Sequence, residues 1–340
     1  TTDADTRTAN VFNGNVKLEV GFAINTLNNN DKLTGSGVNP TLNVTLNTAN
    51  NAAAAITPAL LSGIQTANFE FAAFGGAANA AAIGVQNATG LTNVSLANPA
   101  AAVALNGFGA ALQNLSVTNT ASATTFVFTD AALAGAADSL TLTVNANTSG
   151  GNGININTVN GTSWYETINL VSGGFVQNNV NILQNAGAAG LATLNVSGAA
   201  PFTTLNRSAA LATFNASTAT GNISYTANGE GNASYTGGSG ADNFILGATF
   251  TNQDTVNGGT GTDTITTTSA QATGYAVVTP VTVSNVEVLA LSNALGAALT
   301  TSNISSAINT LELQAVTAAS NTVNTPAGTF TVRNDANSGL

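Results

Sequence analysis

The stretch Leu91-Thr-Asn-Val94-Ser-Leu96 carries the pattern that decides the fold: an apolar residue, two other residues, then apolar, polar and apolar. The last part of this unit alternates between apolar and polar residues, which is the period of a strand with one buried face. The pattern, or a shortened form of it, recurs at residues 112–117, 137–142, 165–170, 191–196, 202–205, 211–214, 283–288 and 308–313. The sequence therefore predicts many short strands of one kind.

The central apolar residues of successive units are spaced like the rungs of a solenoid, a rung being one complete circuit of the chain. After Val94 they recur at Leu115, Leu140, Ile168 and Leu194, in steps of roughly 20 to 28 residues that are typical of a repeat architecture. A short strand cannot bury a face alone, so each is expected to stack on the next at about 4.8 Å. Because the connections are too long for hairpins, the strands should be parallel. The predicted fold is all-β, a parallel β-helix or β-solenoid with one strand in each rung.

Other residues suit such a coil. After Leu194 the steps shorten, to Leu205 and Phe214, which we interpret as narrower rungs or missed ones. Asn tolerates the left-handed backbone at tight corners and can form amide ladders when it is stacked. Asn also interrupts the Ala-rich stretches, so we expect no more than a few short helical turns.

The composition excludes several functional classes. The chain of 340 residues has 15 acidic and 5 basic residues, a net charge of −10, and no His, Cys or Met. Without His or Cys there is no Ser-His-Asp or Cys-His catalytic system and no zinc or haem site of the usual kinds. Five basic residues cannot neutralise a phosphate backbone, which argues against nucleic acid as a partner. No apolar run reaches the roughly 18 residues of a membrane-spanning helix, so membrane insertion is not expected. The low content of charged residues and the absence of Cys and Met are typical of an abundant extracellular protein.

Two segments match the calcium-binding nonapeptide G-G-x-G-x-D-x-U-x: residues 237–244 and residues 258–265. In such a turn the glycines let backbone carbonyls point at a hard cation, and the Asp carboxylate supplies charge. Asp254 lies one nonapeptide length before Asp263, so it is interpreted as a degenerate copy in the same register. The alternative is a Gly- and Asp-rich turn without an ion. The predicted Ca²⁺-binding residues are Gly237, Gly238, Gly240, Asp242, Asp254, Gly258, Gly259, Gly261 and Asp263.

The number of ions stays open, because the separation of Asp242 and Asp263 is neither one nor two nonapeptide lengths. Weaker copies also occur. The stretch from Asn30-Asp31 to Asn39-Pro40 lacks one Gly and has Asn39-Pro40 where Asp-Thr is expected, which weakens an ion site at Asp31. The stretch Gly150-Gly-Asn-Gly153-Ile-Asn155 has Asn in place of Asp, and we interpret it as a turn without an ion.

The order of motifs in residues 253–265, followed by Val283-Ser-Asn-Val286-Glu-Val288-Leu289, resembles the repeat-in-toxin (RTX) type surface-layer (S-layer) proteins of Gram-negative bacteria. The resemblance covers residues 235–291 and 27–69, and between them it rests on composition and repeat style. It implies β-solenoid modules bound together by calcium and an extracellular, cell-surface location.

The expected organisation is an N-terminal strand segment at 1–26, a solenoid at 27–234, calcium-binding turns at 235–268 and further solenoid rungs at 269–340. The N-terminal segment could complete the sheet of a neighbouring copy or pack as the first rung of its own chain. The predicted function is structural: self-assembly outside the cell into a surface layer, filament or sheath, stabilised by calcium. The partners would be further copies of the chain and cell-surface polysaccharide. The alternatives are an adhesin with a solenoid stalk and, less favoured because the acids are isolated, a β-helix enzyme acting on polysaccharide.

Overall fold

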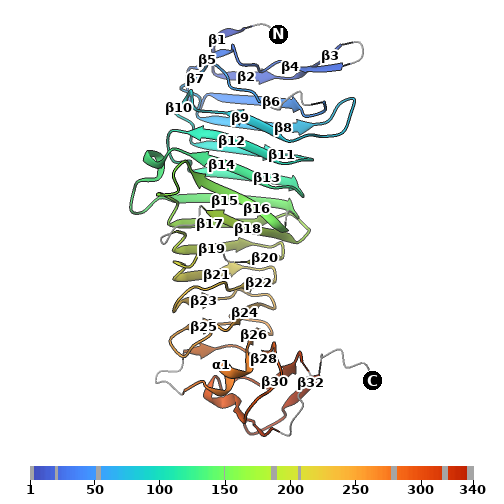
Figure 1. The fold of residues 1–340 in the computed structure, drawn as a ribbon, viewed down its shortest axis with the longest axis vertical. Helices are drawn as coiled ribbons and strands as arrows, with labels where there is room; N and C mark the ends of the chain where they lie inside the picture. The colour runs from blue at the N-terminus through green and yellow to red at the C-terminus, as the bar shows by residue number, and fades with distance from the viewer. Residues whose placement is uncertain are drawn as a thin grey trace. The chain divides into compact units, whose positions relative to one another are not determined.

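A computed structural model describes residues 4–19, 22–50, 55–148, 150–184, 190–205, 208–276, 282–315 and 321–334. The chain divides into two compact units, Thr1–Leu191 and Ala192–Leu340. The division falls within the 27–234 segment of the sequence analysis. Each unit is a stack of short parallel strands (Figure 1).

The first unit contains three sheets whose strands pair in parallel from rung to rung. One sheet has the order β2 (Val11–Gly14), β6 (Thr41–Asn47), β8 (Thr66–Ala72), β11 (Asn93–Ala97), β13 (Asn114–Thr120), β15 (Ser139–Asn147) and β17 (Thr167–Gly173). A second has the order β9 (Ala81–Gly84), β12 (Val103–Phe108), β14 (Thr124–Phe128), β16 (Gly150–Thr158) and β18 (Asn178–Gln184). The third is short: β1 (Thr6–Ala9), β5 (Lys32–Gly35), β7 (Leu60–Ser62) and β10 (Ala88–Thr89).

The second unit repeats the plan with two main sheets. One has the order β19 (Thr193–Gly198), β21 (Thr213–Ala219), β23 (Ser234–Thr236), β25 (Thr255–Asn257) and β27 (Val283–Ser284). The other has the order β20 (Phe202–Leu205), β22 (Ile223–Thr226), β24 (Asn243–Gly247), β26 (Thr264–Thr267), β28 (Val288–Leu291), β30 (Thr310–Leu313) and β32 (Thr331–Asn334). A small pair adds β29 (Leu299–Thr300) and β31 (Val323–Asn324).

Helical structure is brief, as predicted. The described residues contain one five-residue α-helix, α1 (Ser269–Thr273), and two 3₁₀ segments, η1 (Asp130–Leu133) and η2 (Thr301–Asn303). Among these residues, no helix has both the length and the apolar character needed to cross a membrane.

The prediction of a parallel β-solenoid is confirmed, but the prediction of one strand per rung is wrong. Leu194 in β19 pairs directly with Phe214 in β21, whereas Leu205 lies in β20, a strand of the other sheet. The shortened steps after Leu194 are therefore neither narrow nor missed rungs. They mark the second strand that each rung contributes.

The register at β15 also differs from the predicted alignment of Leu115 with Leu140. Leu115 pairs with Leu142, and Leu140 pairs with Ile168 of the following rung. Because side chains alternate between the two faces of a strand, a slip of two positions keeps all of these leucines inside. Leu140, Leu142 and Val144 are all fully buried, so β15 places three alternate side chains in the interior.

Asn has both of the roles expected of it. Five of the six non-glycine residues with positive φ in the described chain are Asn, and the sixth is Ala146. On the outer face of the first sheet, Asn43 donates its amide to Asn13 Oδ1 at 2.9 Å, and Asn68 donates to Asn43 Oδ1 at 2.8 Å. Ser95 Oγ continues the row by donating to Asn68 Oδ1 at 2.7 Å. Side-chain ladders thus join successive rungs outside the core.

The N-terminal segment forms more than one strand. β1 and β2 pair with β5 and β6 of the same chain, so in this structure the segment is the first rung of its own solenoid. Between β2 and β5 the chain forms an antiparallel hairpin of β3 (Val16–Glu19) and β4 (Phe22–Asn25). In β2 the buried side chain is Phe12, whereas Val11 is half exposed.

The 150–155 stretch is not the turn we predicted. It lies in β16, the longest strand of the second sheet in the first unit, where Asn155 donates its amide to Thr125 Oγ1 at 3.2 Å. A Gly-rich sequence is compatible with a strand when neighbouring backbones approach closely.

Candidate metal centre

The three aspartates of the predicted calcium site do not come together. Asp242 and Asp263 each stand immediately before a strand of the same sheet, β24 and β26, which are paired neighbours. Asp254 stands before β25, a strand of the other sheet. The step from Asp242 to Asp263 is thus one full rung, and the step from Asp254 to Asp263 is only part of one. The predicted common register of Asp254 and Asp263 is therefore wrong.

The glycines of both motifs lie where neighbouring rungs approach most closely. A Cβ on Gly258 would overlap the Asn285 carbonyl oxygen and would lie 2.5 Å from Asp263 Oδ2. Gly259 and Gly261 have φ angles of +99° and +136°, which L side chains rarely adopt. A Cβ in ideal geometry on any of the six motif glycines would come closer than 3.0 Å to an atom of a neighbouring rung: Gly237, Gly238, Gly240, Gly258, Gly259 and Gly261.

The acids at this corner form what we call the carboxylate column: Asp242, Asp263 and Glu287, one from each of three successive rungs. Each accepts a backbone N–H from the rung before it. Asp242 Oδ1 accepts from Ile223 N at 2.8 Å, Asp263 Oδ1 from Asp242 N at 2.8 Å, and Glu287 Oε2 from Asp263 N at 2.9 Å. The column therefore links the rungs through charge-assisted hydrogen bonds.

Asp254 has the same role at its own corner. Its Oδ1 accepts from Ala233 N at 2.9 Å and its Oδ2 accepts from Thr251 N at 2.7 Å. Nearby, the buried Glu230 accepts hydrogen bonds from the hydroxyl of Tyr225 at 2.6 Å and from Asn228 N at 2.7 Å. Both oxygens of the Asp254 carboxylate are thus engaged by the protein.

Burial raises the pKa of all three aspartates. For Asp263 the pKa rises to about 6, because the carboxyl is buried and also faces the negative charges of Asp242 and Glu287. The hydrogen bond from Asp242 N opposes this shift. A positive charge at this corner would stabilise the ionised column.

One carboxylate oxygen of the column has no protein partner. Asp263 Oδ2 is buried and has no hydrogen-bond partner, and both this oxygen and the Asn285 carbonyl oxygen lie close to the position that a Cβ of Gly258 would take. All-oxygen donors are the ligands that Ca²⁺ prefers. Among the described residues, no group of three or more His, Cys, Asp or Glu side chains could hold a metal. An ion here would therefore need backbone oxygens and water besides carboxylates.

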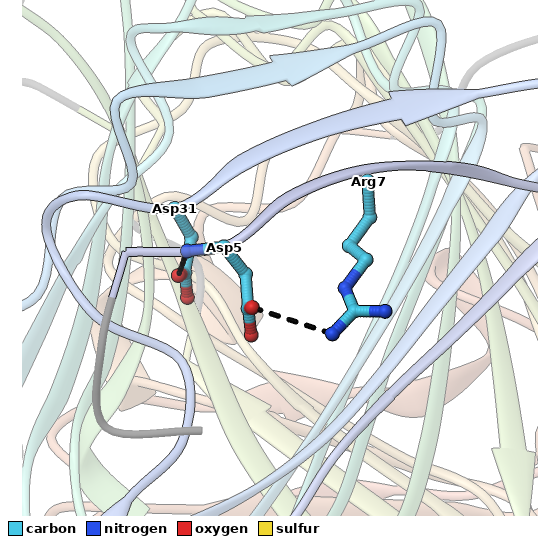
Figure 2. Close-up of polar contacts among 3 residues, drawn as sticks. All are labelled: Asp5, Arg7 and Asp31. Atoms are coloured by element: carbon cyan, nitrogen blue, oxygen red, sulfur yellow. Dashed lines mark hydrogen bonds and ion pairs between the residues drawn. The ribbon is translucent and has the colours of Figure 1, made fainter.

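Acids outside this region also stand before strands and accept N–H groups from the adjacent rung. Asp31 precedes β5; its Oδ1 accepts from Asp5 N at 3.0 Å and its Oδ2 from Asn28 N at 2.9 Å. Figure 2 shows Asp5 between Asp31 and Arg7, whose guanidinium lies 3.5 Å from the Asp5 carboxylate. Glu166, before β17, accepts from Asp138 N at 2.7 Å. The weak motif at Asp31 thus keeps the hydrogen bond between its carboxylate and a backbone N–H of the preceding rung.

Sequence reasoning did not identify Glu287 or the Asn285 carbonyl as part of this corner. Both belong to the 283–289 motif, which carried the family resemblance but was assigned no ligand. A signal was present in the spacing, since Glu287 follows Asp263 at nearly the same interval at which Asp263 follows Asp242. Glu287 is likewise an acid immediately before an apolar strand.

Comparisons with known proteins find one distant relative. An S-layer protein of Synechocystis sp. is 30% identical over 220 residues, and the match takes in 58% of this chain. The chain spans 12% of the length of that relative. No protein-family model matches the chain, and no solved structure matches it.

Proposed function

We propose that this chain is a structural protein that self-assembles outside the cell as part of a surface layer, and that calcium stabilises it at the carboxylate column. The observation that carries the proposal is the stacking of parallel strands in both units, with rows of uncharged side chains on the outer faces. In the first unit one such row runs through paired strands as Thr41, Thr66, Asn93, Asn114, Thr141 and Asn169.

These rows suit contact between copies. Hydroxyl and amide groups both donate and accept hydrogen bonds, so identical surfaces can pair with one another. The row described above contains no charged side chain, so two copies can bring such rows together without placing like charges opposite each other. The same groups could bind cell-surface polysaccharide, the second partner we propose.

The comparison supports a surface role. The relative is named an S-layer protein, and the match to it takes in more than half of this chain. Because the chain spans 12% of that protein, the assembly and location of the whole relative are carried over here as part of the proposal.

A structural role also accounts for the acids better than an enzymatic one. Glycoside hydrolysis uses a pair of carboxyl groups that flank the substrate. Here Asp242, Asp254 and Asp263 are buried and accept backbone N–H groups. We therefore propose no catalytic activity, and reproducible turnover of a polysaccharide panel, lost on mutation of a single acid, would contradict this.

The test is assembly of the intact protein with and without calcium. Negative-stain microscopy and sedimentation should show lattices or fibres in millimolar CaCl₂ and dispersed particles after chelation into MgCl₂ of equal ionic strength, because calcium offsets the charge of the column. Dispersed particles in calcium at high protein concentration would overturn self-assembly. Equal assembly in both buffers would overturn the role of calcium and leave the structural role standing.

A further inference from the structure

We propose that copies of this chain join side by side through the turn at residues 174–176, which inserts the ring of Phe175 into an apolar cavity of a second copy. This cavity, which we call the corner cavity, has a lining that includes Val85, Ala88, Leu91, Phe108, Gly109 and Ala110. Both surfaces belong to the first unit. The inference rests on the self-assembly part of the proposed function and names the two surfaces that meet.

The first support is an aromatic side chain that its own chain leaves uncovered. Phe175 is 104% exposed, and Val176 beside it is 51% exposed. The base of the turn is held in place, because the buried Asn178 donates its amide to Ser172 Oγ at 2.9 Å and to the Gly173 carbonyl at 3.0 Å. A turn that is already ordered loses little conformational freedom on binding, and a fully exposed ring gains most from burial.

The second support is the corner cavity, which forms where the third sheet of the unit stops. β10 is the last strand of that sheet, and the next rung passes this corner after an irregular position in β12. The cavity has a volume of about 290 Å³, near the lower end of pockets that hold small ligands, so it suits one or two apolar side chains. Val85, Leu91 and Phe108 in its lining are buried, whereas Gly109 and Ala110 are exposed at its mouth.

The two surfaces also match in chemistry. Neither residues 172–178 nor the lining of the corner cavity contains a charged side chain, so their contact leaves no buried charge unpaired. Phe108 offers the incoming ring an aromatic neighbour, and its own ring stacks on that of Phe128 with centroids 4.8 Å apart. Aromatic pairs are favourable beyond the area that they bury.

The topology places the two surfaces on opposite sides of the first sheet. Phe175 follows β17 at the C-terminal ends of that sheet's strands, whereas the corner cavity precedes the N-terminal ends of β11 and β13 (Figure 1). At about 3.3 Å per residue, the seven residues of β17 separate the two sides by roughly 20 Å. One copy can therefore use its turn and its cavity at once, on two different neighbours. Such a heterologous contact forms a ring or an open row of copies rather than a two-fold dimer.

Sedimentation and negative-stain microscopy, under conditions in which the wild type assembles, test the contact. Phe175→Ala should raise the protein concentration needed for assembly by about tenfold or more, because the variant lacks the ring that leaves water. Ala110→Asp should have the same effect, since it places a charge at the mouth of the corner cavity. Both residues are exposed, so both variants should keep the wild-type circular dichroism spectrum.

Phe74→Ala is the matched control, because it removes the same ring from the turn after β8, on the same side of the first sheet as Phe175. Phe74 is 43% exposed. The concentration needed for assembly should stay within about twofold of the wild-type value, as for most residues outside a hot spot. Equal losses in Phe74→Ala and Phe175→Ala would mean that any exposed ring on this side promotes assembly, which would overturn the specific contact.

Engineered cysteines identify the surface that the turn meets. The chain has no Cys, so a disulfide can form only between introduced residues. Val176→Cys and Ala110→Cys combined in one chain, oxidised after assembly, should give a ladder of covalent multimers on a non-reducing gel, because the contact repeats from copy to copy. Each single variant should stay monomeric on the same gel, since like residues do not meet.

Assembly of the double variant without a ladder would place the ring elsewhere and overturn the corner cavity as its site. If the wild type stays dispersed, the self-assembly part of the proposed function fails together with this contact. If the wild type assembles and both Phe175→Ala and Ala110→Asp assemble equally well, this inference alone fails.

Discussion

Gly258→Ala is expected to destabilise the second unit by about 3 kcal/mol, at the upper end of the usual effect of overpacking. The added methyl group would overlap the Asn285 carbonyl oxygen and lie 2.5 Å from Asp263 Oδ2, and a backbone carbonyl cannot swing aside as a flexible side chain can. The two rungs would have to separate at this corner. Urea unfolding followed by circular dichroism, carried out in chelator, measures the loss without a contribution from calcium.

Gly231→Ala is the matched control for this change. A Cβ on Gly231 would meet no heavy atom within 4 Å, and its φ is not in the left-handed region. Its effect should stay within about 0.5 kcal/mol, as for most surface substitutions. Equal losses in the two variants would mean that the rungs are not closely stacked at Gly258.

Phe244→Ala is expected to cost about 3–5 kcal/mol, the usual range for removing a buried aromatic ring. Phe244 is 0% exposed, and its ring centroid lies 6.2 Å from those of both Phe214 and Tyr235. These rings come from β21, β23 and β24, so the cavity would loosen both main sheets of the unit. Thermal and urea unfolding should both show the loss, with and without calcium.

The control for this prediction makes the same chemical change on the surface. Phe175, in the turn between β17 and β18, is 104% exposed, so Phe175→Ala removes no buried area and should change stability by no more than about 0.5 kcal/mol. A small effect of Phe244→Ala, similar to that of the control, would show that the ring cluster does not form the core of this unit.

The main lines of the fold could be predicted because one sheet has a clear sequence pattern. The pairs Val94 with Leu115 and Leu194 with Phe214 keep the interior apolar along the first sheets. The second sheets were harder to recognise. β9 reads Ala-Ala-Ile-Gly, and its small residues give too little contrast between its faces. β20 reads Phe-Thr-Thr-Leu and was recognised as a strand, but it was placed in the same sheet as β19 and β21. Missing the second strand of each rung led directly to the wrong register for Asp254.

The candidate site was predictable in its residue types but not in its geometry. A Gly-Gly-x-Gly-x-Asp turn has the same sequence whether its carboxylate accepts a backbone N–H or also binds an ion. What distinguishes Asp263 from Asp242 is the one oxygen without a donor: Gly238 N donates to Asp242 Oδ2, whereas its counterpart Gly259 N donates to Asn257 Oδ1. Sequence spacing places these rungs side by side but does not specify which oxygen stays free.

Every carboxylate of the column accepts its N–H from the rung before it, so unfolding rung by rung breaks different groups at the two ends of the stack. When rungs unfold from the C-terminal side, Glu287 is lost from the column and the backbone N–H of Asp263 has no acceptor in the protein. This donor is neutral, and water readily accepts its hydrogen bond. When rungs unfold from the N-terminal side, the backbone N–H of Ile223 is lost and the Asp242 carboxylate, a charged acceptor, loses that donor. Leaving a charged group unpaired costs more than leaving a neutral one. Under a mechanical load, this stack should fray more easily from its C-terminal side than from its N-terminal side.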